Sequence, residues 1–149
     1  ALAEGRIDVV ATDHAPHTLA EKTGDYFKTA AGLPLVQYAF TSLLELVQDK
    51  KLSIERLVEA SSHSVAKRFG IIDRGFLREG YWADIILVDM NQGCTDTPEK
   101  VMYKCGWSPF DGFEFRSRID TTIVNGTIVY ANGKLTSQEN IGQRIEFLS

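Results

Sequence analysis

The chain has 149 residues, of which 44% are hydrophobic and 24% are charged, a composition typical of a globular protein with a proper core. Its formal net charge of −4 and its scattered lysines and arginines argue against nucleic acid and anionic membrane surfaces as partners. No apolar run approaches the length of a membrane span, so we expect no membrane association.

The cysteines and the first residues bear on the cellular setting. Cys94 and Cys105 stand outside any Cys-x-x-Cys pattern, which favours two free thiols in a reducing cytoplasm over a disulfide. We therefore expect a cytoplasmic protein. The sequence begins with Ala1 in what looks like the middle of a helix, which favours a piece of something longer.

The first predicted elements are a helix end, a strand and a loop. Gly5 suits the residue that ends a helix, and residues 7–12 (IDVVAT) predict a short buried strand. Residues 19–32 are polar and show no clean period. A loop of this length is typical of a functional lid or binding loop.

Helices are predicted next. Apolar residues recur at helical spacing after Pro34, which suits the first position of this helix. Ser53 is a favourable N-cap for a second helix. The pair Ser61 and Ser62 is expected to break that helix and to cap a third, short one that stops at Gly70.

After residue 70 the composition changes toward β structure. Residues 83–89 (ADIILVD) predict a buried strand bounded by turns. Residues 91–115 contain two prolines and five aromatic residues without a period, and we expect an irregular segment there.

A β-hairpin is predicted near the end of the chain. Residues 118–124 form its first strand and residues 127–130 its second. Asn125-Gly126 between them is a signal for a type I′ turn, and Asn132-Gly133 predicts another turn after the hairpin.

The chain therefore divides into two parts, with strand, loop and helices up to about Gly70 and mostly β structure afterwards. A single strand cannot satisfy its own backbone hydrogen-bonding groups. Residues 1–70 are consequently not expected to be a complete α/β domain, and the missing strands are expected from elsewhere.

The sequence Asp13-His14-Ala15-Pro16-His17 follows the predicted strand directly. Aspartate and histidine are the residue types that metal ligation and proton transfer need, and the proline stiffens the turn between them. The pattern favours a carboxylate at the tip of a strand with an imidazole held beside it. An aspartate that only forms a turn, followed by a solvated loop, is the alternative that the spacing leaves open.

Three parts of the chain carry a resemblance to a known family. They are TDHAPH at residues 12–17, SHSVAKRFGIIDRGFLREGYWADIILVD at residues 62–89, and the pair SPFDG and TIVNG at residues 108–112 and 122–126. Together they resemble the C-terminal third of the dihydroorotases, within the amidohydrolase superfamily. TDHAPH is the specific motif, and the other stretches mark the superfamily.

The resemblance implies an α/β fold. It is the C-terminal part of a metal-dependent hydrolase (β/α)8 TIM barrel, with the last strand and helices, plus a small β-sandwich-like domain. On this basis residues 1–70 would be the C-terminal segment of the barrel domain, with its eighth strand, loop and helices. Residues 71–149 would be the small β domain with the C-terminal tail.

The resemblance also implies a reaction. Dihydroorotases reversibly hydrolyse the cyclic amide of L-dihydroorotate to N-carbamoyl-L-aspartate in pyrimidine biosynthesis, using one or two Zn²⁺ ions. Asp13 matches the aspartate that contacts the metal and acts as general base, taking a proton from the attacking water and returning it to the leaving nitrogen. His17 matches the histidine that donates to the substrate carboxylate. The backbone N–H groups of Ala31 and Gly32 fall where relatives also contact that carboxylate, although the loop around them departs from the commoner pattern; His14 matches a variable position without a role.

Most of the site that the family implies lies outside this sequence. A His-x-His motif, a bridging lysine or carboxylate, two further histidines, and the substrate-binding arginine and asparagine all belong to earlier strands. His63 is expected to cap a helix or to lie at the surface, so Asp13 is the one expected metal ligand, where zinc needs about three. We therefore expect activity on a small-molecule substrate only when the chain is joined to the N-terminal part of the barrel, and a homodimer in the complete enzyme.

Three other functions stay open. A hydantoinase, dihydropyrimidinase or allantoinase would share Asp13 but generally lacks a histidine at the position of His17. A non-catalytic dihydroorotase-like subunit that associates with a transcarbamoylase would usually have lost the residues that Asp13 and His17 represent. An autonomous β/α binding module without chemistry is the third.

Overall fold

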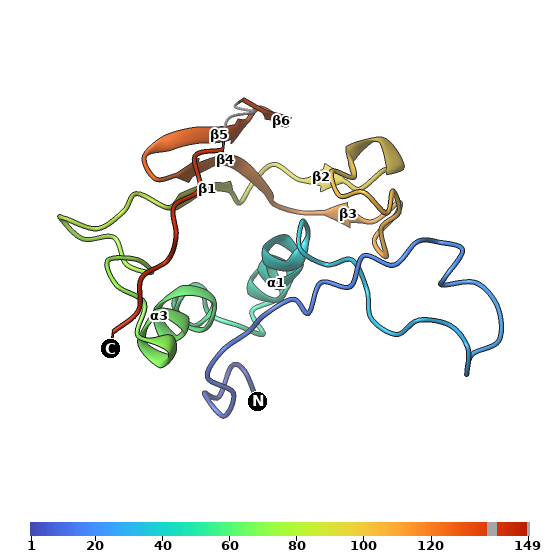
Figure 1. The fold of residues 1–149 in the computed structure, drawn as a ribbon, viewed down its shortest axis with the longest axis horizontal. Helices are drawn as coiled ribbons and strands as arrows, with labels where there is room; N and C mark the ends of the chain where they lie inside the picture. The colour runs from blue at the N-terminus through green and yellow to red at the C-terminus, as the bar shows by residue number, and fades with distance from the viewer. Residues whose placement is uncertain (137–139, 149) are drawn as a thin grey trace.

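The computed structural model describes residues 1–136 and 140–148 of the chain. Its strands and its helices lie on opposite sides of the molecule, and the N-terminal segment, blue in Figure 1, runs past the helices into a long loop at one end. Within the described residues, no helix has the length and apolarity that crossing a bilayer requires. Both cysteines are free thiols, as the sequence predicts.

Helix α1 spans Ala39–Gln48. The prediction that Pro34 begins this helix is wrong. The backbone before Ala39 is engaged elsewhere, since the Val36 N–H donates to the His14 ring 3.1 Å away and the Tyr38 N–H donates to the Leu35 carbonyl. Pro34 is fully buried in the turn that precedes the helix.

Helix α2 spans Ile54–Val58 and begins as predicted, because the Ser53 hydroxyl oxygen accepts from the Arg56 N–H at 3.1 Å. The predicted break at Ser61 and Ser62 is wrong. A π-helix, η1 (Glu59–His63), joins α2 to α3 (Ser64–Phe69) without interruption.

The serines do not cap a helix because at least one is used inside it. The Ser61 hydroxyl donates to the Leu57 carbonyl at 2.7 Å, a bond within the helical ladder. His63 makes no capping bond with its side chain and instead stacks on Phe76, with ring centroids 4.4 Å apart. Helix α3 ends as predicted at Gly70, whose φ of 62° lies in the left-handed region.

The main sheet is antiparallel, with the strand order β1-β4-β5-β6. These strands span Ile85–Asp89 (β1), Arg118–Val124 (β4), Thr127–Ala131 (β5) and Lys134–Leu135 (β6). The predicted hairpin is confirmed as β4 and β5, and Asn125 and Asn132 both adopt the left-handed φ that the two predicted turns require.

Strand β1 differs from its prediction in burial. Residues 83–89 were expected to form a buried strand, but β1 begins at Ile85 and leaves Leu87 50% exposed. Within the described residues β1 pairs with β4 alone, so one of its edges and part of its face remain in solvent.

The segment of residues 91–115 is mostly irregular, as predicted, with a small two-stranded sheet at its ends. Strands β2 (Cys94–Thr95) and β3 (Glu114–Phe115) pair antiparallel, and a short 3₁₀-helix, η2 (Pro98–Lys100), lies between them. Phe115 is buried and stacks on Tyr38, with ring centroids 5.6 Å apart. This contact joins the small sheet to the start of α1.

Residues 7–12 do not form the predicted strand. Their backbone is held instead by a hydrogen bond from the Val10 N–H to the Ala60 carbonyl at 3.1 Å and by one from the Arg56 guanidinium to the Ile7 carbonyl. A strand needs a neighbour to pair with, and the described residues place none beside this segment. The prediction of a strand is therefore wrong for this structure.

The core lies between the helices and β1. Leu44, Leu52 and Leu57 are buried together, with Val88 of β1 packed against them. The last residues return to the end of α3, where the Leu148 N–H donates to the Gly70 carbonyl at 2.7 Å. The proposed division of the chain at residue 70 stays a prediction.

Candidate active site

Asp13 lies where the extended segment turns into the long loop. Its φ of 44° is in the left-handed region, which is uncommon for a residue with a Cβ but which aspartate tolerates better than most. Its side chain is exposed. Strained backbone of this kind at an exposed carboxylate often accompanies functional sites.

His14 has a structural role that the sequence did not indicate. Its Nδ1 accepts a hydrogen bond from the Val36 N–H, and its ring meets Tyr103 edge to face with centroids 5.3 Å apart. Because Nδ1 is an acceptor, the ring proton is on Nε2. Spacing gave no signal for this role, since the two partners lie 22 and 89 residues away.

The Ala31–Gly32 segment lies directly against the motif of residues 13–17. His14 and Leu33 form a parallel bridge, and the Ala15 N–H donates to the Leu33 carbonyl at 3.0 Å. Gly32 has a φ of 86°, and a Cβ on it would stand 2.6 Å from the Ala15 Cβ. Only glycine fits this contact without a shift, so the structure brings two of the predicted site segments together.

His17 is held through its main chain and remains partly accessible through its ring. Its N–H donates to the Ala15 carbonyl at 2.9 Å, and its carbonyl accepts from the Trp107 indole N–H at 2.8 Å. Its Nδ1 lies 3.8 Å from Glu21 Oε2, and 40% of its side chain is exposed. The ring is thus available to a ligand while its backbone is fixed.

Glu21 is itself ordered by the residue that follows His17. Its Oε2 accepts from the Thr18 N–H at 2.7 Å and from the Thr18 hydroxyl at 2.9 Å. These two hydrogen bonds, first the backbone one, lower the pKa of Glu21. The carboxylate beside His17 is therefore held in its charged form.

The predicted metal site is not complete in this chain. In residues 1–136 and 140–148, no three His, Cys, Asp or Glu side chains lie close enough together to hold a metal ion. Asp13 is the single predicted ligand, and about three protein ligands are needed for zinc. The residues present do not by themselves fit a zinc ion.

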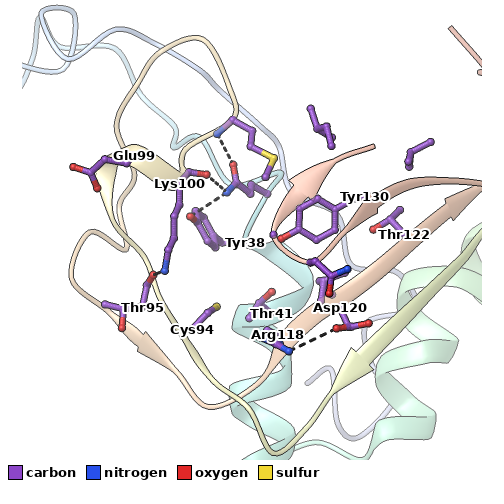
Figure 2. A pocket seen from close by; sticks show the side chains of 17 residues that line it. Tyr38, Thr41, Cys94, Thr95, Glu99, Lys100, Arg118, Asp120, Thr122 and Tyr130 are labelled. Carbon is purple, nitrogen blue, oxygen red and sulfur yellow. Dashed lines mark hydrogen bonds and ion pairs between the residues drawn. The ribbon is translucent and has the colours of Figure 1, made fainter. Parts of the chain in front are cut away.

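A cavity of about 700 Å³ lies away from this motif, between α1 and the strands. Tyr38, directly before α1, and Thr41 of α1 lie on one side of this cavity, and Arg118, Asp120 and Tyr130 of the sheet lie on the other (Figure 2). The Arg118 guanidinium lies 3.6 Å from the Asp120 carboxylate. This cavity is not lined by the predicted site residues Asp13, His17, Ala31 and Gly32. The candidate site therefore lies outside the cavity.

A buried polar pair lies beside the cavity. The Tyr38 hydroxyl donates to Asp96 Oδ1, and both side chains are almost fully buried. Burial first, and then the bond to Asp96, raise the pKa of Tyr38 above its usual value. Within the described residues Asp96 Oδ2 has no hydrogen-bond partner.

Comparison with known proteins gives the same family throughout. The sequence matches the amidohydrolase family over residues 1–129. It is 39% identical to the dihydroorotase of Halobacterium salinarum over 131 residues, 87% of this chain and 30% of that protein. It is 36% identical to the dihydroorotase of Methanosphaera stadtmanae over 122 residues, 82% of this chain and 28% of that protein.

A solved structure gives the corresponding likeness in three dimensions. The L-hydantoinase (dihydropyrimidinase) of Arthrobacter aurescens superposes with a TM-score of 0.84 at 28% identity, over 97% of this chain and 33% of that structure. This likeness confirms the expected fold class, a portion of an α/β amidohydrolase. The chain spans between 28% and 33% of the length of these three proteins. The chain belongs to the amidohydrolase family.

Proposed function

We propose that this chain is the C-terminal part of a dihydroorotase, which reversibly hydrolyses L-dihydroorotate to N-carbamoyl-L-aspartate. Two dihydroorotases at 36% and 39% identity support this proposal. The observation that carries it is the bridge between His14 and Leu33, which places Gly32 against Ala15. Through it, the segment that carries Asp13 and His17 lies beside the exposed Ala31–Gly32 backbone.

The roles of the four site residues form part of the proposal. Asp13 is the general base that takes a proton from the attacking water and later gives it to the leaving ring nitrogen. His17 and the N–H groups of Ala31 and Gly32 bind the substrate carboxylate. His17 suits this role because its ring is accessible while its main chain is fixed by Trp107.

The metal is proposed from the resemblance and not from this chain alone. One or two zinc ions would contact Asp13, and their remaining ligands would come from the N-terminal part of the barrel. We also propose a homodimer and a cytoplasmic location for the complete enzyme. Metal analysis, light scattering and cell fractionation of the complete protein would test these three points.

The test of the reaction uses the complete enzyme with dihydroorotate as substrate. We expect Asp13→Asn to abolish turnover, because the amide is not a base. We expect His17→Ala to raise KM far more than it lowers kcat, since it removes a contact to a carboxylate that does not react. Loss of bound zinc on His17→Ala, or unchanged turnover with Asp13→Asn, would contradict the roles.

A hydantoinase or dihydropyrimidinase activity is the second candidate, because the Arthrobacter aurescens L-hydantoinase superposes on nearly the whole chain. The substrates of such enzymes do not all carry the carboxylate that His17 is proposed to bind. Rates with dihydroorotate and with dihydrouracil, the same ring without the carboxylate, separate the two. Faster hydrolysis of dihydrouracil would favour the second candidate. No turnover of either by the complete protein would favour the non-catalytic subunit.

A further inference from the structure

The side chain of Lys22 makes two hydrogen bonds to backbone carbonyls of its own loop. Its ammonium group donates to the Ala30 carbonyl at 2.6 Å and to the Gly32 carbonyl at 2.9 Å. The side chain is partly buried, although a lysine ammonium is strongly hydrated and is normally found in water. The two carbonyls stand on either side of Ala31.

The bond to the Ala30 carbonyl fixes the direction of the N–H that follows it. In a trans peptide the carbonyl of one residue and the N–H of the next point to opposite sides. When the Ala30 carbonyl faces Lys22, the Ala31 N–H therefore faces away from it. Within the described residues, neither the Ala31 nor the Gly32 N–H donates to a protein acceptor, so both are free for a ligand.

Glu21, the residue before Lys22, contacts the other half of the same site. Its carboxylate holds Thr18 and lies 3.8 Å from the ring nitrogen of His17. Glu21 thus contacts His17, and Lys22 contacts the Ala31–Gly32 segment, which are the two groups proposed to bind the substrate carboxylate. Contact between the two halves also depends on Gly32 lying against Ala15.

We propose that Lys22 is a positioning residue for substrate binding, which turns the Ala31 N–H toward the substrate carboxylate by bonding the Ala30 carbonyl of the same peptide, and which holds the loop in place through the Gly32 carbonyl. This inference rests on the proposed dihydroorotase function. Lys22 acts through the backbone that it orders and does not touch the reacting bond.

The test is Lys22→Met in the complete enzyme, because methionine keeps the length of the side chain without its donors. We expect KM for dihydroorotate to rise about 10- to 100-fold, with kcat within about threefold of wild type. The inhibition constant of orotate, a planar analogue with the same carboxylate, rises by the same factor. Lys28→Met, an exposed lysine of the same loop, is the matched control and leaves all three values unchanged.

Two results would overturn the inference. One is a KM and an orotate inhibition constant within about twofold of wild type. The other is a fall in kcat without a change in either constant, as a general disturbance of Asp13 would cause. Lys22→Arg keeps the charge but changes the donor geometry, and we expect an intermediate rise in KM. If Lys22→Met does not fold, the KM and the orotate inhibition constant of Lys22→Arg test the inference by the same criteria.

Failure of the inference is distinguishable from failure of the proposed function. Wild-type enzyme that prefers dihydrouracil to dihydroorotate refutes the function, and with it this role of Lys22. Wild-type enzyme that prefers dihydroorotate, combined with an unchanged KM in Lys22→Met, refutes the role of Lys22 alone.

Discussion

The β4–β5 hairpin and the segment of residues 7–32 are both largely extended chain, but they are held in different ways. The hairpin pairs with itself through a two-residue turn, and its partners lie a few residues apart in the sequence. The earlier segment is held by Ala60, Val36 and Trp107, from 22 to 90 residues away. Pairing within the hairpin is thus local, whereas the segment that carries the candidate site depends on distant contacts.

This difference has a consequence for mutations. A substitution that affects pairing within the hairpin acts on neighbours in the sequence, although Asn125 in its turn also bonds to Arg74 and to the Ile141 carbonyl. A substitution in residues 7–32 acts on one of a few long-range contacts. The following four changes test the contrast on the complete protein, with unfolding in urea as the common measurement.

The largest effect is expected for Gly32→Ala. The new Cβ would stand 2.6 Å from the Ala15 Cβ, at a backbone φ of 86°. Overlap and left-handed strain together should lower the free energy of unfolding by about 2–4 kcal/mol. Activity should fall as well, because the bridge to the motif opens.

The control for this change is Gly80→Ala. Gly80 has nearly the same φ, 82°, but no atom within 4 Å of its added Cβ. It should cost only about 1 kcal/mol from backbone strain. Equal losses in the two variants would show that the contact with Ala15 does not matter.

The second largest effect is expected for Tyr38→Phe, at the junction of α1 and the small sheet. The change leaves the buried Asp96 without its donor, and we expect a loss of about 2–3 kcal/mol. Tyr26→Phe, on an exposed ring, is the control and should leave the free energy of unfolding within about 0.5 kcal/mol.

The same variant should change the dependence of stability on pH. The pKa of Tyr38 is raised in the folded state, so its contribution is complete below its unfolded pKa of about 10 and is lost as the pH rises above that value. Wild-type stability should therefore fall more steeply than that of Tyr38→Phe above about pH 10. Parallel curves would show that Tyr38 ionises equally in both states.

A smaller effect is expected in the hairpin for Asn125→Ala. Asn125 has a φ of 49°, donates to the Ile141 carbonyl at 2.6 Å, and accepts from Arg74 at 2.8 Å. Loss of about 1–2 kcal/mol is expected. Asn132→Ala, at the other turn, has a similar φ of 53° without these two bonds, and a smaller loss there would separate turn strain from side-chain bonding.

The smallest effect is expected for Ser53→Ala, where the stabilising contact spans three residues. Removing the hydroxyl that accepts from the Arg56 N–H should cost about 1 kcal/mol. Ser53→Asp keeps an acceptor at the cap and should retain wild-type stability. A loss with aspartate equal to that with alanine would contradict the capping role.

The same contrast explains which elements could be predicted from the sequence. The hairpin, its two turns, the Ser53 cap and the helix end at Gly70 depend on a few neighbouring residues, and all are confirmed. The strand at residues 7–12 was predicted from its β-favouring residues, but a strand forms only beside a partner. The helix start at Pro34 failed for a related reason, because His14 takes the Val36 N–H.

The candidate site was predictable in its residue types but not in its supports. Asp13 and His17 stand out in the motif itself, and Gly32 as a glycine in a long polar loop. Lys22, Trp107 and the structural role of His14 depend on contacts between residues far apart in the sequence or on the path of the loop. No spacing rule indicates these contacts, since they arise only when the chain is folded.

The bond from Trp107 to the His17 carbonyl gives the candidate site a built-in optical signal. Indole emission responds to the hydrogen bonding and polarity around the ring. The chain contains two tryptophans. The other one, Trp82, packs against Arg74, whose guanidinium carbon lies 5.2 Å from the centroid of the indole ring. Replacing Trp82 with phenylalanine would leave Trp107 as the only indole of this chain, whose fluorescence then follows the position of the His17 loop without any label.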